Sequence, residues 1–419
     1  MDEKSTRGLR RQLPRHDLAE IHDELERLHD DVAHEEGAER LAGRVARHPV
    51  DHAETDQRRA DVARENERLV RGRQAESGEH RAGKHEQQKT EDDRGDAADR
   101  ERETRADVRQ AAYARQTTRM GYDPFAEGPH GVAMRSGELR DPRRDARRLD
   151  YEVWYPAEPG ALAGPCPLLL YSHASGGHRR QSSFLCSHLA SHGYVVAAAD
   201  HAGNTAADFA ERTRRRARGR APTDPEMQAY IARIIADRVP DLRTLCDEVI
   251  GRGASEISAM VDPGRIGLVG WSFGGWAVLA AVEADDRFGA VAALAPAGSS
   301  NPLPGIIPAK LTYERKREAP TLILAADQDR FIPLSGLREI FDRTPSAKRM
   351  YVLHGADHQH FADDVQPEGG CTRERAHLFT RALTLAHFDE ALKGDSAASD
   401  FLANAIDRLR ARGVEANAV

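Results

Sequence analysis

The feature that most constrains this chain is a serine flanked by glycines, which lies between a strand-like and a helix-like segment. Segment 265–269 favours a short β-strand, and the apolar segment 277–282 favours a helix. Residues 270–275 read Gly-Trp-Ser-Phe-Gly-Gly and carry Ser272. A serine at such a strand-to-helix turn has a strained backbone, and a Cβ at either flanking glycine would collide with the neighbouring strand or helix. The pattern therefore predicts a nucleophile elbow that presents the Ser272 hydroxyl to a substrate.

The first 119 residues differ in composition from the rest of the chain. They are rich in Arg, Glu, Asp, His, Ala and Gln, and Tyr113 is their one aromatic residue. Because so little apolar surface cannot offset the entropy lost on ordering, we predict that residues 1–119 are a charged, mostly disordered arm or a non-native extension. Ordinary globular composition begins at Met120, where we expect natural translation to start. Residues 120–419 are predicted to form the catalytic domain.

Charge, hydropathy and cysteine usage exclude several classes of protein. The formal net charge of −7 is spread over both signs, which indicates no basic face for nucleic acid. Apolar runs of about 18 residues and the apolar core of a signal peptide are both missing, so we predict a cytoplasmic protein with no membrane span. The four cysteines are widely spaced, which predicts free, mostly buried thiols and no zinc site: Cys166, Cys186, Cys246 and Cys371.

After Met120 the pattern alternates between strands and helices. Segments 132–139 and 149–155 are predicted to pair as antiparallel strands. Six apolar runs follow that are typical of parallel strands buried on both faces: 167–171, 194–200, 266–270, 290–295, 321–326 and 349–353. Further helices are expected at 181–192, at 226–251 with an interruption at Pro240, at 378–392 and at 398–410. The fold class is therefore α/β, with a mostly parallel central sheet and helices on both faces.

A polar, Arg-rich stretch from His201 to Pro225 interrupts this alternation. We predict that it is irregular and that its basic part, 213–220, is a solvated loop. It follows the carboxyl end of a strand, which is where substrates bind in open α/β sheets. The stretch is therefore expected to form a lid or a wall of the substrate pocket.

Two later strands are each followed by a residue that could activate Ser272. Asp329 comes after strand 321–326, and His358 comes after strand 349–353. A serine hydroxyl is a poor nucleophile unless a base takes its proton and a third group orients that base. Serine, acid and base therefore form a candidate triad at one edge of the sheet.

Each of the two partners has a neighbour that could replace it. Asp327 lies at the strand end itself, but Asp329 is preferred because it precedes the Phe-Ile-Pro at which the loop turns away. His358 and His360 are too far apart along their loop to hold the same position beside Ser272. His358 is preferred because it follows a turn of small residues directly.

The anion that forms during acyl transfer needs backbone donors. One should be the N–H of Phe273, directly after the nucleophile, and the other an N–H of loop 172–177. Ser175 is our candidate in that loop. His173 and Trp271 are the candidate residues of the substrate pocket.

From about Gly128 onward the sequence resembles the dienelactone-hydrolase-like and platelet-activating-factor-acetylhydrolase-like branch of the α/β hydrolases. The resemblance rests on the Ser272 elbow and on four other segments: 152–157, 171–177, 200–205 and 358–363. It implies an α/β-hydrolase fold and a Ser272, Asp329, His358 triad with no metal or organic cofactor. Two positions depart from the pattern. Ala174 stands where the family usually has glycine, and true dienelactone hydrolases use cysteine at the position of Ser272, so their substrate is not implied.

These observations predict a serine carboxylester hydrolase that acts on small or short-acyl esters. The elbow also resembles that of the prolyl-oligopeptidase group, so a serine peptidase or acyl-peptide hydrolase is one alternative. That group carries a propeller domain in front, however, and the arm here lacks strands and aromatic residues. A non-catalytic α/β-hydrolase scaffold is the other alternative. The expected partner is a small-molecule ester, and the sequence indicates no particular oligomeric state.

Overall fold

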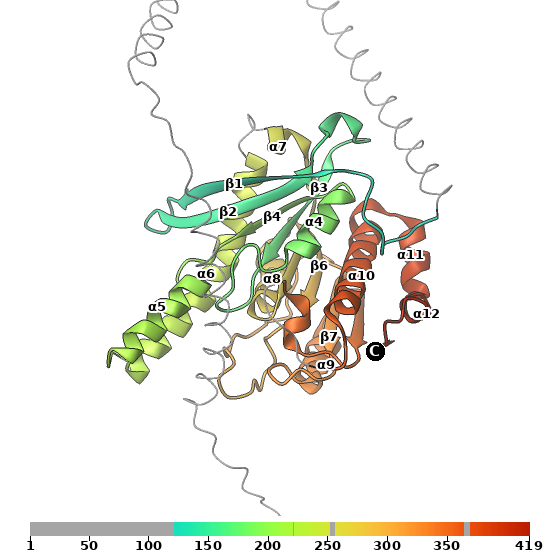
Figure 1. Cartoon of the computed structure of the whole chain (residues 1–419). Coiled ribbons are helices and arrows are strands. Elements are labelled where there is room, and N and C mark those ends of the chain that lie inside the picture. The colour runs from blue at the N-terminus through green and yellow to red at the C-terminus, as the bar shows by residue number, and fades with distance from the viewer. Residues whose placement is uncertain (1–120, 221, 252–255, 364–368) are drawn as a thin grey trace, which may run out of the picture. The chain divides into compact units, whose positions relative to one another are not determined.

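The computed structural model describes residues 121–220, 222–251, 256–363 and 369–419. The predicted arm, residues 1–119, lies outside the described residues. The described part contains one sheet of nine strands in the order β1-β2-β4-β3-β5-β6-β7-β8-β9 (Figure 1). The strands are β1 (Val132–Asp141), β2 (Arg147–Pro156), β3 (Cys166–Ser172), β4 (Val195–Ala199), β5 (Val261–Trp271), β6 (Phe288–Leu294), β7 (Thr321–Ala326), β8 (Lys348–Leu353) and β9 (Ala416–Ala418).

The sheet is parallel in its centre and antiparallel at both edges. β1 and β2 pair antiparallel from Val132 opposite Pro156 to Asp141 opposite Arg147, which confirms the predicted pair. β2 is also antiparallel to β4, whereas the neighbouring pairs from β4 through β3, β5, β6 and β7 to β8 are parallel. β9, which the sequence did not predict, is antiparallel to β8. The carboxyl ends of the parallel strands therefore meet at one edge.

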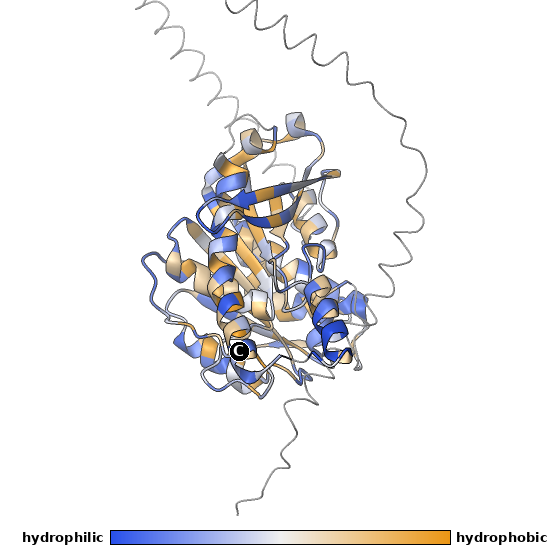
Figure 2. Ribbon diagram, turned by 90° about the vertical axis from the view of Figure 1, so that its left-hand side faces the viewer, coloured by the Kyte–Doolittle hydropathy of each residue, from blue (hydrophilic) through white to orange (hydrophobic). Residues whose placement is uncertain are grey.

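Helices cover both faces of the sheet, as predicted. One face packs against α4 (Ser183–Ser191), α10 (Arg373–Lys393), α11 (Ser396–Ala403) and α12 (Ala405–Arg410). The other packs against α6 (Asp224–Gly251), α7 (Glu256–Met260), α8 (Phe273–Ala284) and α9 (Leu334–Arg343). Leu169 and Tyr171 of β3 face the first layer, and Leu168 and Leu170 face the second, because successive side chains of a strand point to opposite sides. Hydrophobic residues accordingly gather along the central strands (Figure 2).

The prediction that the insertion after β4 is irregular was wrong. Residues 206–217 form a helix, α5 (Ala206–Ala217), which includes most of the basic stretch assigned to a loop. Thr205 begins it with a capping box: its side chain accepts from the Asp208 N–H, and the Asp208 carboxylate accepts from the Thr205 N–H. Arginine and alanine also favour helix, so a polar sequence becomes helical once its first turn is capped. Phe209 is buried and attaches the helix to the body of the protein.

Other predicted helices differ in detail. Pro240 does not interrupt α6, which runs unbroken because buried residues before and after the proline, such as Ile234 and Leu242, hold it against the core. The predicted helix 398–410 is two helices that meet at Asn404. α10 ends at Gly394 as predicted, in the left-handed conformation with φ +65°. The four cysteines are free, and three of them are buried, as expected.

Candidate active site

Ser272 lies in the sharp turn between β5 and α8. Its φ of +58° is a left-handed conformation that residues other than glycine rarely adopt. A Cβ at Gly270 would lie 2.3 Å from the carbonyl oxygen of Gly274, and one at Gly274 would lie 2.0 Å from that of Ser172. Glycine at both positions allows the close approach of β5, α8 and the end of β3, as the sequence predicted.

The structure brings Ser272, His358 and Asp329 together. The Ser272 Oγ lies 2.9 Å from the Nε2 of His358, and the Nδ1 of His358 lies 2.6 Å from the Oδ2 of Asp329. Because the carboxylate can only accept, the Nδ1 carries the proton, and the Nε2 is free to accept the Ser272 proton. The His358 ring also lies between the Trp271 ring, 5.3 Å away, and the Phe331 ring, 5.5 Å away. Its orientation is therefore set from three directions.

The loop after β7 directs Asp329, and not Asp327, toward His358. The Oδ1 of Asp329 accepts from the N–H groups of Phe331 and Ile332 at 2.9 and 2.8 Å, which leaves Oδ2 for the histidine. Asp327 instead accepts from the Gly355 N–H at 2.8 Å, and its other oxygen lies 3.0 Å from the His354 Nδ1. Asp327 thus ties the loops after β7 and β8 together.

His360, the other candidate base in the loop after β8, bonds to groups other than Ser272. The Nδ1 of His360 lies 2.7 Å from the Oδ1 of Asp357, and its Nε2 lies 2.9 Å from the carbonyl oxygen of Cys371. Burial lowers the pKa of His360, but these hydrogen bonds outweigh it and raise the pKa above its usual value. His360 therefore stabilises the short 3-10 turn, η2 (His358–Phe361), in which His358 lies.

Loop 172–177 passes beside Ser272 and contains Ser175. The Ala174 N–H donates to the side-chain oxygen of Gln181 at 3.1 Å, and Gly176 takes the left-handed conformation at φ +71°. Ala174 is not one of the described residues that have a positive φ, so its backbone conformation does not require glycine. Phe273 begins α8, and the N–H groups of a first helical turn have no partner inside the helix. Ser175 and Phe273 both line the cavity beside Ser272.

His173 does not line the cavity, contrary to its prediction as a pocket residue. It is fully buried behind the loop, where its Nε2 accepts from the His201 N–H at 3.0 Å and its Nδ1 lies 2.7 Å from the Ala174 carbonyl oxygen. Burial, together with the nearby charge of Arg238, lowers the pKa of His173 well below its usual value. Its ring is therefore neutral and part of the support of the loop.

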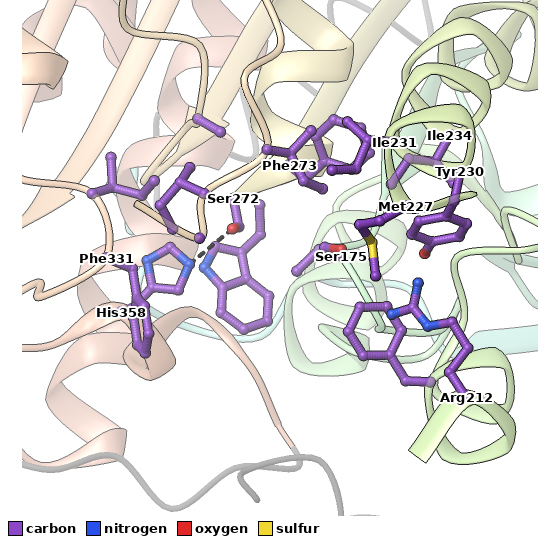
Figure 3. A pocket seen from close by; sticks show the side chains of 18 of the residues that line it. Ser175, Arg212, Met227, Tyr230, Ile231, Ile234, Ser272, Phe273, Phe331 and His358 are labelled. Carbon is purple, nitrogen blue, oxygen red and sulfur yellow. Dashed lines mark hydrogen bonds between the residues drawn. The ribbon is translucent and has the colours of Figure 1, made fainter. Parts of the chain in front are cut away.

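A cavity of about 390 Å³ opens beside Ser272 and His358. Figure 3 shows His358 and Phe331 on one side of Ser272, with Ser175 and residues of α5 and α6 on the other. Trp271 lines the cavity. Most of the remaining lining is apolar: Phe209, Met227, Tyr230, Ile231, Ile234, Ala297, Ile306, Ile307 and Ile332. The inserted stretch supplies part of the wall, as expected, but as a helix.

Arg212 of α5 is a cavity residue that the sequence did not single out. Its guanidinium carbon lies 4.0 Å from the Phe209 ring centre and 4.2 Å from the Tyr230 ring centre, so the two rings enclose it. In the sequence it was indistinguishable from the exposed arginines that follow it. It differs from them because the ring of Tyr230, in α6, lies opposite its guanidinium.

In the part of the chain that the structure describes, no helix is long and apolar enough to cross a bilayer. Within those same ranges, no group of three or more His, Cys, Asp or Glu side chains could hold a metal ion.

The model of one protein family matches more than half of the chain. The model of the Dienelactone hydrolase family matches residues 155–385, which include β3 to β8 and the three residues Ser272, Asp329 and His358. No curated protein matches the chain.

Proposed function

The chain belongs to the dienelactone hydrolase family, whose members are hydrolases of the α/β-hydrolase type, and we propose that it is a serine carboxylester hydrolase acting on small or short-acyl esters. The observation that carries the proposal is the 2.9 Å contact between the Ser272 Oγ and the His358 Nε2 at the wall of an apolar cavity. A hydroxyl, a base and an orienting carboxylate arranged in this way perform nucleophilic acyl transfer in unrelated folds.

In the first half of the reaction, the Ser272 Oγ attacks the ester carbonyl carbon and its proton passes to the His358 Nε2. Asp329 stabilises the imidazolium that forms and keeps the ring in place. The carbonyl oxygen becomes an anion, which accepts hydrogen bonds from the N–H groups of Phe273 and Ser175. When the tetrahedral intermediate collapses, the bond to the alcohol oxygen breaks, and His358 gives its proton to the leaving alcohol.

In the second half, water releases the acid. His358 takes a proton from the water, whose oxygen attacks the acyl carbon of the Ser272 ester. Collapse of this second intermediate breaks the bond to the Ser272 Oγ, which regains the proton from His358. The cycle uses side chains and backbone donors of this chain only.

The size and lining of the cavity favour small esters. A volume of about 390 Å³ is at the lower end of the range typical of sites for small molecules. Its apolar wall from α5 and α6 suits an uncharged acyl or alcohol group better than the polar backbone of a peptide.

A panel of p-nitrophenyl esters from acetate to decanoate, run beside aminoacyl p-nitroanilides, tests the proposal. We expect fastest turnover with the short acyl chains and little or none with the anilides. Faster cleavage of the anilides would favour the peptidase alternative. A chain that turns over no ester and whose Ser272 is not labelled by a fluorophosphonate would be a non-catalytic scaffold.

A further inference from the structure

A buried arginine of α6 holds the loop that carries Ser175. The Arg238 side chain is 1% exposed. Its guanidinium donates to the carbonyl oxygens of His173 at 2.5 Å and Ala174 at 3.2 Å. It also donates to the Oδ1 of Asn204, whose Nδ2 in turn donates to the Ser175 Oγ at 3.0 Å. A further bond runs to the Ser172 Oγ at 3.2 Å, so Arg238 is connected to four successive residues of the loop, and it does not itself line the cavity.

The same arginine also lies against Phe273, the second proposed oxyanion donor. The guanidinium carbon of Arg238 lies 4.6 Å from the ring centre of Phe273, which is a cation–π contact. On its other side the Phe273 ring stacks on Trp276, with 5.1 Å between the ring centres. One side chain therefore links loop 172–177 to the first turn of α8.

Arg238 has no carboxylate partner among the described residues. Asp241, one turn further along α6, pairs instead with Arg144 and Arg147. Burial lowers the pKa of Arg238 to about 9, so the group is charged at neutral pH. Burying a charge costs free energy, and the hydrogen bonds from Arg238 to two loop carbonyls and to Asn204 offset part of that cost. The backbone of loop 172–177 is therefore the main partner of this arginine.

The geometry of one peptide group suggests what the arginine does. The Ala174 carbonyl and the Ser175 N–H belong to the same planar group, so holding the oxygen also sets the direction of the N–H. Besides the Arg238 bond, this oxygen accepts one from His173, whose Nδ1 must carry the proton because its Nε2 accepts from the His201 N–H. A charged donor on the carbonyl also polarises the peptide and makes its N–H a stronger donor.

We propose that Arg238 is a positioning residue of the oxyanion hole, which holds the Ala174–Ser175 peptide so that the Ser175 N–H points at the reacting carbonyl oxygen. This inference rests on the proposed esterase function. Arg238 touches neither substrate nor the reacting atoms, and it acts through the backbone of loop 172–177.

The test compares the full-length protein with Arg238→Met and Arg238→Lys, using p-nitrophenyl acetate as substrate. We expect Arg238→Met to lower kcat by about 10- to 100-fold, less than the roughly 100- to 1000-fold typical when an oxyanion donor is removed outright. KM should stay within about threefold, because the donor acts mainly on the transition state. Arg238→Lys keeps the charge but not the two-pronged geometry, so we expect it to recover part of the lost kcat.

A second measurement separates this role from general support of the fold. Phenyl trifluoromethyl ketone adds to the Ser272 Oγ, and its carbonyl oxygen becomes an anion in the same place as that of the substrate. Its inhibition constant should rise in Arg238→Met by the same factor by which kcat/KM falls. The matched control is Arg315→Met, which removes a partly buried arginine that also donates to a carbonyl, that of Ala319 at 2.8 Å, but lies outside the cavity lining. It should lower the melting temperature and leave kcat within about twofold.

The outcomes are distinct. If Arg238→Met keeps the kcat and inhibition constant of Arg315→Met, the positioning role is overturned and the esterase function stands. If Arg238→Met does not fold, Arg238→Lys decides: wild-type values of both quantities overturn the role, and a matched loss of about fivefold or more supports it. If the wild-type protein turns over no ester, the proposed function fails and the positioning role fails with it.

Discussion

The described residues contain two Ser-His-Asp arrays with similar hydrogen-bond distances, and among these residues only one array borders a cavity. In the first, Ser272 lies 2.9 Å from His358, which lies 2.6 Å from Asp329. In the second, the Ser172 Oγ lies 3.0 Å from the His201 Nε2, and the His201 Nδ1 lies 3.0 Å from the Asp241 Oδ2. Hydrogen-bond distances alone therefore do not distinguish a nucleophile from a buried polar network.

The surroundings of the two serines separate them. Ser172 is fully buried at the end of β3, with no route for a substrate, and its Oγ also accepts from Arg238 at 3.2 Å. Ser272 stands in a strained turn at a cavity wall. We therefore propose that the first array is the catalytic one. The second satisfies buried polar groups behind loop 172–177.

The largest expected effect comes from replacing each of the two serines. Ser272→Ala should lower kcat by about a millionfold and leave the fold intact, because it removes the nucleophile. Ser172→Ala should lower kcat by less than about tenfold, and it should cost about 1–3 kcal/mol of stability because the His201 Nε2 loses its donor. Steady-state kinetics and urea unfolding of both variants measure this difference.

Covalent labelling provides an independent check of the same contrast. A fluorophosphonate should modify Ser272, as located by peptide mass spectrometry. Modification of Ser172 in the native protein would mean that the buried array is accessible. Retained activity in Ser272→Ala would mean that another serine is the nucleophile.

Replacing the two aspartates should give the next largest difference in kcat. Asp329→Asn should lower kcat by about 10,000-fold, because the amide favours the wrong tautomer of His358. Asp241→Asn should act mainly on stability: its carboxylate pairs with Arg144 and Arg147, and breaking a buried ion pair costs about 3–5 kcal/mol. For this comparison kcat is calculated per folded molecule, so that a loss of stability is not counted as a loss of catalysis. A greater loss of kcat in Asp241→Asn than in Asp329→Asn would reverse the assignment of the two arrays.

Sequence reasoning identified the first array because each member follows a strong local signal. Ser272 lies in a glycine-flanked turn, and Asp329 and His358 each follow an apolar strand whose carboxyl end must lie at the same edge of a parallel sheet. Local pattern and topology were therefore enough to predict the central strands and to nominate these three residues. Each of the pairs Asp327 and Asp329, and His358 and His360, lies in one loop. The geometry distinguishes the two members of each pair, and the sequence does not.

The second array had no such signal. Arg238 and Asp241 lie in a helix with other charged residues, and only the packing of α6 against the sheet shows which of these are buried. His173 was assigned to the pocket for a related reason: position in a loop does not reveal which side of the loop a ring occupies. The helical state of α5 was missed because its polar, Arg-rich sequence was interpreted as a solvated loop, although arginine favours helix and Thr205 and Asp208 form a cap.

The two arrays meet at Gly274, which provides the third prediction. A Cβ there would lie 2.0 Å from the carbonyl oxygen of Ser172 and 2.6 Å from that of His173. Backbone atoms cannot swing aside as a side chain can, so Gly274→Ala should separate α8 from loop 172–177. We expect a loss of about 3 kcal/mol of stability and a fall in kcat of about 10- to 100-fold. Gly160→Ala, whose Cβ would have nothing within 4 Å, should stay near wild type in both. Equal behaviour of the two variants would contradict the contact.

The smallest expected effect is a pH dependence that distinguishes the two histidines: His201 should affect stability, and His358 should affect activity. Burial lowers the pKa of His201 to about 4, below the roughly 6.5 of an unfolded histidine. Between these values the unfolded chain binds a proton that the folded chain does not, so the free energy of unfolding should decrease as the pH falls from 7 to 5, by about 2 kcal/mol for this group. His201→Asn should remove that part of the decrease in urea unfolding, while other histidines contribute equally to both proteins. Activity should still fall reversibly with acid in His201→Asn, because only neutral His358 can accept the Ser272 proton. Loss of the acid limb of kcat/KM in this variant would mean that His201, and not His358, is the base.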